Sequence, residues 1–178
     1  MPSIFVTKSW ESSKDYKTHD IVIYPINNKN KYFYALKDHT SSGGNVPSAS
    51  SAFWGGQSFS SMTASIKPTF IWRPSYNLTV NSSPRVIVIK FGDGYEQRNV
   101  DGINSLLLAI DIGFEGRDSK EAAAILHFFS ARNATESFLL TLPHPYDSAK
   151  LFVCREWANT LVFYNNYSIR AKIDEVTS

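Results

Sequence analysis

The sequence predicts a mainly β protein of the α+β class, in which one helix packs against antiparallel strands. Most apolar residues lie in short runs bounded by Gly, Pro, Asn and Ser, and the clearest runs are 85–90 and 105–114. One stretch, residues 118–133, has the spacing of an amphipathic helix. Residues 1–60 are rich in aromatic and turn-forming residues, which indicates a small β module ahead of the main domain.

Length and composition fit a compact domain preceded by a small module. The chain has 178 residues, of which 43% are hydrophobic and 14% aromatic, enough for a packed core. The region 48–65 is dominated by Ser, Ala and Gly, and we interpret its second half as a linker. The expected division is a module over 1–60, a linker over 61–66 and a larger domain over 67–178.

The N-terminal module begins with a predicted hairpin. Residues 20–24 and 31–36 are strand-like, and the polar stretch 25–30 between them supplies the turn. An ordered series of residues here resembles the small chitin-binding-like modules of carbohydrate-binding families 5 and 12, which are compact three-stranded units: Trp10, Tyr16, Asp20, Val22, Tyr24, Tyr32, Ala35, Pro47 and Trp54.

Aromatic rings in such a module have two interpretations. An exposed ring can stack on the apolar face of a sugar, which makes five residues candidates for glycan binding: Trp10, Tyr16, Tyr24, Tyr32 and Trp54. Residues 37–44, however, lack the neighbouring exposed aromatics that the family usually carries after its second strand. A small unit also needs large side chains merely to stay folded, so a structural core is the favoured interpretation.

The larger domain should open with residues 70–72, an irregular segment to residue 84, and then a hairpin. The apolar run 85–90 precedes a string whose glycines can adopt the positive φ angles of a tight turn: Phe91, Gly92, Asp93, Gly94, Tyr95, Glu96, Gln97 and Arg98. A turn needs the glycines but leaves the flanking residues free. The string is therefore longer than a turn alone requires.

A long strand and the helix follow the hairpin. Over 105–114 every second residue is large and apolar, while the other face carries smaller or polar residues such as Asp111. Asp118 begins the helix with a capping-box-like pattern, and Asn133 suits a left-handed stop. The spacing predicts a buried face of Ala122, Ile125, Leu126 and Phe129, with His127 on the helix surface.

The rest of the chain is again β. Strand-like runs lie at 137–142, 150–157, 160–164 and 167–176. The segment Pro143, His144, Pro145 and Tyr146 should form an exposed loop, because proline cannot donate to a central ladder. Cys154 lies in an apolar pattern and is expected to be a buried, unreactive thiol.

No pattern for catalysis, a metal or a cofactor is visible in the sequence. The histidines at 19, 39, 127 and 144 are isolated, and a lone cysteine cannot begin a structural zinc site. Asp93 and Glu96 could be paired carboxylates, but a residue between two turn glycines is well solvated and poorly prepared for general-acid work. We therefore expect no enzyme, no catalytic residues, no metal and no cofactor.

Charge and hydropathy restrict the partners. The net charge is +2, with no basic stripe for a phosphate backbone, so nucleic acid is not an expected sequence-specific ligand. Neither a signal peptide nor a membrane-spanning run is visible, which predicts a protein that is made and kept soluble without membrane insertion.

The string 91–98 also carries a family resemblance, together with residues 143–146 and 150–157. In order and spacing these segments resemble the M-type minor tail proteins at the tail tips of lambda-like long-tailed phages, over about residues 70–176. The resemblance implies a tail-tube-like β-sandwich or split barrel with one flanking helix. It also implies a virion structural protein, assembled in the host cytoplasm, that forms a ring between the tail tube and the receptor-binding hub.

Several further expectations follow from that resemblance. The ring should be a homohexamer, and DNA should pass through its lumen. Large side chains expected in exposed loops are candidates for the subunit interface, namely Trp72, Tyr76, Tyr146 and Tyr164, with Tyr167 of the same kind. The alternative function is adhesion to host-surface glycans by the N-terminal module, with the larger domain as its mount. A cell-wall hydrolase is a more distant alternative.

Overall fold

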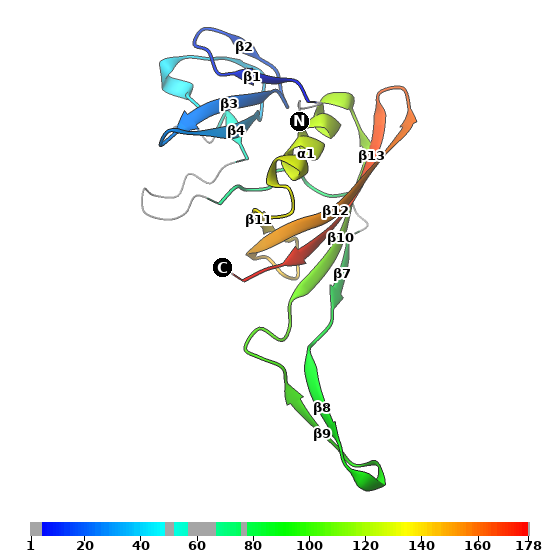
Figure 1. Ribbon diagram of the computed structural model, residues 1–178. Helices are drawn as coiled ribbons and strands as arrows, with labels where there is room; N and C mark the ends of the chain where they lie inside the picture. Colours follow the sequence, from blue (N-terminus) through cyan, green and yellow to red (C-terminus); the bar gives the residue numbers. More distant parts are fainter. Residues whose placement is uncertain (1–4, 49–51, 57–66, 76–77, 178) are drawn as a thin grey trace.

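A computed structural model describes residues 5–48, 52–56, 67–75 and 78–177. Its main body is a curled, half-barrel sheet of five strands in the order β11-β12-β13-β10-β7 (Figure 1). The strands are β7 (Thr79–Ser82), β10 (Leu108–Arg117), β11 (Phe138–Thr141), β12 (Ala149–Phe163) and β13 (Asn166–Glu175). All neighbouring strands in it are antiparallel. The predicted mainly β class with one helix is confirmed.

The helix α1 (Ser119–Arg132) begins and ends where the sequence predicts. The Asp118 carboxylate accepts hydrogen bonds from the backbone N–H groups of Lys120 and Glu121, both at 2.8 Å. Asn133 adopts the left-handed conformation, with φ 45°, and its N–H bonds back to the carbonyls of the last turn. Both ends of the helix are therefore set by capping residues that are local in the sequence.

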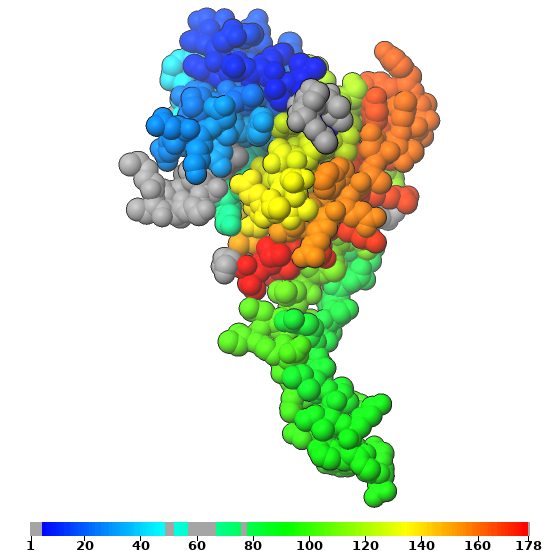
Figure 2. Space-filling model, in the orientation of Figure 1, coloured from blue at the N-terminus to red at the C-terminus, as the bar shows by residue number. Residues whose placement is uncertain are grey.

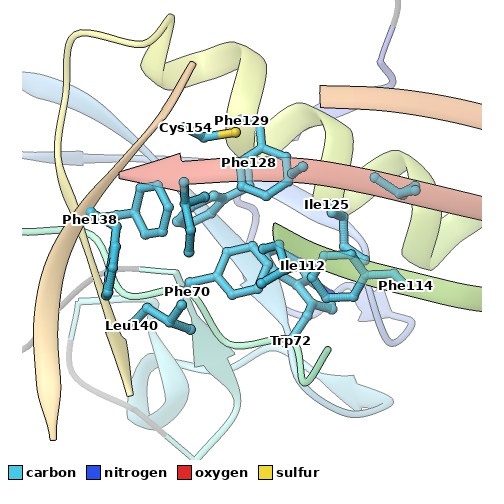
Figure 3. Packing of buried hydrophobic residues seen from close by; sticks show 14 of the residues in the cluster. Phe70, Trp72, Ile112, Phe114, Ile125, Phe128, Phe129, Phe138, Leu140 and Cys154 are labelled. Carbon is cyan, nitrogen blue, oxygen red and sulfur yellow. The ribbon is translucent and has the colours of Figure 1, made fainter. Parts of the chain in front are cut away.

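One face of the sheet packs against α1. Along β10 and β13 the buried residues alternate with more exposed ones, as a half-covered sheet requires, and the covered set is Ile110, Ile112, Phe114, Ile169, Ala171 and Ile173. Between sheet and helix lies a group of aromatic rings (Figure 3), in which the Phe70 ring stacks on Phe129 at 5.5 Å. Cys154 is buried in this core, as predicted, and burial raises the pKa of its thiol to about 12.

The structure has one strand that the sequence analysis did not predict, and it joins two predicted strands into one. The irregular segment expected before residue 84 contains β7, a short strand that pairs with the start of β10. The runs 150–157 and 160–164 form the single strand β12, which is 15 residues long. Bulges near residues 155 and 162 let it bend with the curled sheet without ending. Pairing to the long partner β13 keeps residues 158 and 159 extended.

The N-terminal residues form two small sheets. A four-stranded sheet has the order β1-β3-β4-β6, from β1 (Thr7–Ser9), β3 (Ile21–Ile26), β4 (Lys29–Ala35) and β6 (Trp54–Gly55). A second pair joins β2 (Asp15–Tyr16) to β5 (His39–Thr40). The predicted β3–β4 hairpin is present, but its turn is tighter than predicted. Asn27 and Asn28 both have positive φ, and the residues around them continue the strands.

Two apolar clusters divide the core unequally. The smaller consists of Tyr16, Val22, Phe33, Ala35 and Trp54, with Trp10, Tyr24, Ile26 and Phe53 at its border. The larger lies between α1 and the main sheet, and it includes Ile21 and Tyr34 from the N-terminal sheet. Alternate residues of β3 and β4 therefore pack in opposite directions, one set into the small cluster and the other onto α1.

The helix is consequently covered on two sides. Figures 1 and 2 show the N-terminal sheets resting on α1, on the side away from the main sheet. The prediction that His127 lies on the helix surface is wrong, because His127 is buried beneath the N-terminal strands. The expected linker 61–66 lies outside the described residues. Among the described residues no helix is long and apolar enough to cross a membrane.

Candidate assembly surfaces

A hairpin arm projects from the main sheet. It consists of β8 (Val86–Lys90) and β9 (Glu96–Val100), which pair in register from Val86 opposite Val100 to Lys90 opposite Glu96. The arm continues beyond β7 and β10 and extends well clear of the rest of the molecule (Figures 1 and 2). In the described structure β8 and β9 pair with each other and with no third strand. Both outer edges of the arm are therefore open.

The string predicted as a turn forms the tip of this arm. A single 3-10 turn spans Gly92–Gly94, and the N–H of Phe91 donates to the carbonyl oxygen of Tyr95 at 2.8 Å. The prediction of a positive φ at one of the glycines is confirmed at Gly94, with φ 78°. Asp93 supplies the second positive φ, at 66°, so Gly92 does not need one. Gln97 and Arg98 belong to β9.

Strand β8 of the arm is apolar on both of its faces. Four successive β-branched residues, Val86 to Ile89, are each 42–49% exposed, although alternate residues of a strand point to opposite faces. Phe91, Tyr95 and Val100 extend this apolar surface to the tip and to the second strand. Strands that are apolar on both faces normally become buried on both. An isolated two-stranded hairpin is also marginally stable in water, so the arm has the properties of an element that a partner covers.

A second exposed apolar surface lies where β12 turns into β13. Leu161, Val162 and Phe163 are consecutive and all more than half exposed, and Tyr164 at the turn is 95% exposed. We call residues 161–164 the β12 tip. Figure 1 shows this turn and the arm at opposite ends of the sheet. The molecule therefore presents two different apolar surfaces that point away from each other.

The face of the sheet opposite α1 is open and charged. A hollow of about 460 Å³ lies over β10, β13 and β12, with Gly113 and Ala158 where large side chains would otherwise fill it. Around it stand Asp111, Glu115, Glu156, Arg170 and Lys172. Cross-strand neighbours carry opposite charges, since Lys172 faces Asp111 on one side and Glu156 on the other. The open face thus has no concentration of positive charge.

The structure places the predicted interface residues in very different environments. Tyr164 is exposed at the β12 tip, and Tyr146 is 38% exposed in the predicted loop after β11. Trp72 is not in an exposed loop, as the sequence analysis expected, but buried between Phe70 and Tyr34 in the main core. Tyr76 lies outside the described residues. Sequence alone missed the β12 tip as a continuous surface, because it predicted a break in that strand.

The candidate glycan-binding aromatics do not form a common platform. Tyr16 and Trp54 are buried, so in this structure they have no ring face available to a sugar. Tyr32 packs its ring against His127 at 4.6 Å. Trp10 and Tyr24 are partly exposed, but their rings meet edge to face at 87°. Two perpendicular rings do not offer a flat surface for a pyranose.

A buried polar contact connects the N-terminal sheet to α1. The Tyr34 hydroxyl, from β4, lies 3.0 Å from Nδ1 of His127 on the helix. Burial, together with the nearby Arg132 guanidinium, lowers the pKa of His127 from 6.5 to about 4, so the ring is neutral at pH 7. Arg132 lies over the Phe128 ring at 3.4 Å and donates to the Phe128 carbonyl. The contact is structural, since it is closed to solvent.

The described residues contain no group of three or more His, Cys, Asp or Glu side chains that could hold a metal ion. Glu96, which the sequence offered as half of a carboxylate pair with Asp93, instead forms an ion pair with Arg98 on the same strand of the arm. The features that stand out are therefore surfaces for protein contacts: the arm, the β12 tip and the open face of the sheet.

Comparison with protein families also indicates a protein that functions through contacts with other proteins. Residues 68–177 match the phage minor tail protein family, a region that contains α1, the main sheet, the arm and the β12 tip. The chain belongs to the phage minor tail protein family. It is therefore a structural component of a phage tail, and the family resemblance of the string at the arm tip is confirmed.

Two individual proteins are similar to this family member. Tail tip protein M of Escherichia phage lambda is 31% identical over 91 residues, which is 51% of this chain and 82% of the lambda protein. A chain in the tail of an empty GTA particle, solved with C6 symmetry, aligns with a TM-score of 0.39 and 11% identity, covering 65% of this chain and 85% of that one. The family match begins at residue 68, so the N-terminal sheets lie outside it.

Proposed function

We propose that this minor tail protein forms a closed ring at the distal end of a long phage tail, where it joins the tail tube to the receptor-binding hub. The observation that carries the proposal is the arm, which exposes β-branched residues on both faces and has two open edges. A monomer gains nothing from such an element, and its exposed edges favour aggregation. A ring of copies would cover it.

The two apolar surfaces favour cyclic rather than twofold assembly. A twofold dimer uses the same patch on both subunits, whereas the arm and the β12 tip differ in shape and lie at opposite ends of the sheet. Contacts between two different patches are head-to-tail, and they close into a ring when the rotation between subunits allows it. The resemblance suggests six copies, which would match a sixfold tube above the ring.

In this ring we assign the open face of the sheet to the channel. The opposite face is occupied by α1 and the N-terminal sheets, which would form the outer wall. Acidic Asp111, Glu115 and Glu156 outnumber Arg170 and Lys172 around the hollow. A lining with this balance would not hold the phosphates of a DNA duplex that passes through, whereas a strongly basic lining would.

For the N-terminal module, in its described residues 5–48 and 52–56, we propose a structural role as a unit that is docked rigidly on α1. Its support is the shared core, in which Tyr34 is fully buried against the helix and hydrogen-bonded to His127. Glycan binding has less support, because two of its five candidate rings, Tyr16 and Trp54, are buried. We further propose that the protein has no enzymatic activity and reaches the virion from the host cytoplasm.

Electron microscopy of intact tails tests the ring. We expect density for the main sheet around the tail axis at the tip, with the N-terminal sheets outside it. Monomer in dilute solution is compatible with a ring that closes only on the tube. Finding the chain only on a peripheral fibre, with no copy around the axis, would refute the proposal.

An arm variant adds a functional test. Val88→Lys puts a charge on an exposed position of the arm, so the isolated protein should unfold as the parent does, while tail assembly should fail. Lys29→Ala, at an exposed position of the N-terminal hairpin, is the matched control and should assemble normally. Normal infectious tails with Val88→Lys would count against an arm contact in the ring.

A further inference from the structure

Strand β4 of the N-terminal sheet has an open edge along its first part. Strand β6 pairs with β4 only at Tyr34 and Ala35. In the part of the chain that the structure describes, no strand lies beside residues 29–33 on that side. Figure 2 shows the hairpin of β3 and β4, in blue, at the surface of the molecule. This edge can therefore accept a further strand without displacing a described element.

Main-chain hydrogen bonds show which residues of β4 face this edge. The N–H of Ala35 donates to the residue that precedes β3, whereas the N–H of Leu36 donates to the residue that precedes β6. Because the direction alternates along an antiparallel strand, the even-numbered residues of β4 direct their main-chain groups away from β3. Asn30 and Tyr32 therefore each present an N–H and a carbonyl group to the open edge. No partner for these groups is found among the described residues.

Two lysines stand beside the open edge, on one face of the sheet. Lys29 is paired with Ile26 and Lys31 with Tyr24, and both of these partners lie at the border of the smaller apolar cluster. Lys29 and Lys31 are two positions apart in a strand, so their side chains point the same way. Among the described residues neither forms an ion pair, whereas the lysines at 8, 14 and 17 in the same module do. The edge thus carries two cations that no acid of the described chain neutralises.

The charges indicate what occupies this edge. Cross-strand neighbours of opposite charge stabilise a sheet, so a strand that matches Lys29 and Lys31 has acidic residues at alternate positions. This chain has no two acidic residues that are two positions apart. Residues 57–66, which follow β6 in the sequence, contain no acidic residue. Neither a second copy nor that segment therefore supplies the matching strand, which points to a segment of a different protein.

We propose that an extended segment of a different protein, with acidic side chains at alternate positions, adds to the open edge of β4 as a further antiparallel strand. Its main chain bonds to Asn30 and Tyr32, and its acidic side chains face Lys29 and Lys31. The contact goes beyond the proposed ring. Because the family match begins at residue 68, the ring does not depend on this module, and tails with a changed edge should still assemble.

Peptide binding to the full-length protein tests the match of charges. A fluorescently labelled peptide of alternating valine and glutamate should bind, measured by anisotropy, and the same peptide with lysine in place of glutamate should not. Lys29→Glu with Lys31→Glu should weaken binding by about tenfold or more, since both cross-strand pairs become repulsive. Lys17→Glu with Lys37→Glu is the matched control, because it changes the net charge equally at exposed positions away from the edge.

Two further measurements distinguish strand addition from simple attraction of charges. In the antiparallel arrangement the valines lie opposite Asn30 and Tyr32 and make the main-chain hydrogen bonds. Methylating the valine nitrogens keeps the charge of the peptide but should abolish its binding. The amide protons of Asn30 and Tyr32 should exchange rapidly with solvent in the free protein and slowly with the unmodified peptide bound, as observed by nuclear magnetic resonance.

Each outcome supports or overturns the proposed contact. Binding that survives methylation, or that leaves the Asn30 and Tyr32 amides unprotected, would overturn strand addition. Alginate, a polysaccharide rich in carboxylates, should compete poorly, and stronger binding of alginate than of the peptide would assign the two lysines to a glycan instead. The ring is tested separately, because tails that carry Lys29→Glu with Lys31→Glu should lose peptide binding and keep the density around the tail axis. Loss of that density in this variant would contradict a contact that is independent of the ring.

Discussion

Replacing Gly56 by alanine should destabilise the protein by about 2–5 kcal/mol, because Gly56 lies against the joint between the N-terminal sheets and α1. A Cβ at this position would meet Tyr34 Cδ2 at 2.4 Å and Cε2 at 2.7 Å. The Tyr34 ring cannot move aside easily, since it is fully buried, packs on Trp72 at 4.9 Å and is hydrogen-bonded to His127.

The expected destabilisation by Gly56→Ala is the sum of two contributions. Gly56 has a φ of 95°, where an L side chain costs about 1–2 kcal/mol. Overpacking against a fixed ring costs roughly 1–3 kcal/mol more. Gly116→Ala is the matched control, because its φ is 68° but a Cβ there meets nothing within 4 Å. The control should show the strain alone, and both variants gain the same small benefit from a stiffer unfolded chain.

Urea unfolding, followed by tryptophan fluorescence, measures the difference. We expect the Gly56→Ala midpoint to lie below that of Gly116→Ala by an amount equal to about 1–3 kcal/mol. Equal midpoints would refute the idea that Tyr34 is held rigidly in the joint. A parent protein that unfolds in two separate steps, with Gly56→Ala shifting only the first, would show that the N-terminal sheets do not share the stability of α1.

Other variants test the remaining contacts. Between pH 6.5 and about 4 the unfolded chain binds a proton at His127 that the folded protein rejects, so stability should fall by up to about 3 kcal/mol as the pH drops through this range. His127→Gln should flatten that loss in acid unfolding curves, and an unchanged pH profile would contradict the assignment. Asp118→Ala removes two capping hydrogen bonds and should lower the free energy of unfolding, measured in urea, by about 1 kcal/mol. Asp118→Asn keeps a side-chain oxygen that can accept these bonds, so it should keep most of the parent's stability. Tyr34→Phe leaves Nδ1 of His127 without its hydroxyl partner and should cost about 1–2 kcal/mol in the same assay, while no loss would mean that the bond contributes nothing.

Several features were determined by local sequence alone. The helix, its Asp118 cap and its Asn133 stop depend on residues within a few positions of one another, and all three are where the pattern predicts. The turn at Gly92–Gly94 likewise follows from residues that tolerate positive φ. The family string at this turn carried enough information to indicate a minor tail protein.

The errors arose where distant segments meet. His127 has the spacing of a surface residue, yet the N-terminal strands cover it, and Trp72 is buried by Tyr34 from β4 for the same reason. The spacing of apolar residues along a helix predicts one buried face. It does not predict that a second face, which carries polar residues such as His127, is covered by another sheet.

For the candidate assembly surfaces, too, some features follow from the local sequence and others only from the tertiary structure. Sequence determined that residues 85–98 form a hairpin, because strand and turn propensities are local. Only the tertiary structure decided that this hairpin leaves the body, that β12 continues through residues 158 and 159 to expose its tip, and that both edges are open. Apolar strands have the same sequence pattern whether their own chain or another copy covers them, because burial depends on what lies next to a strand in space.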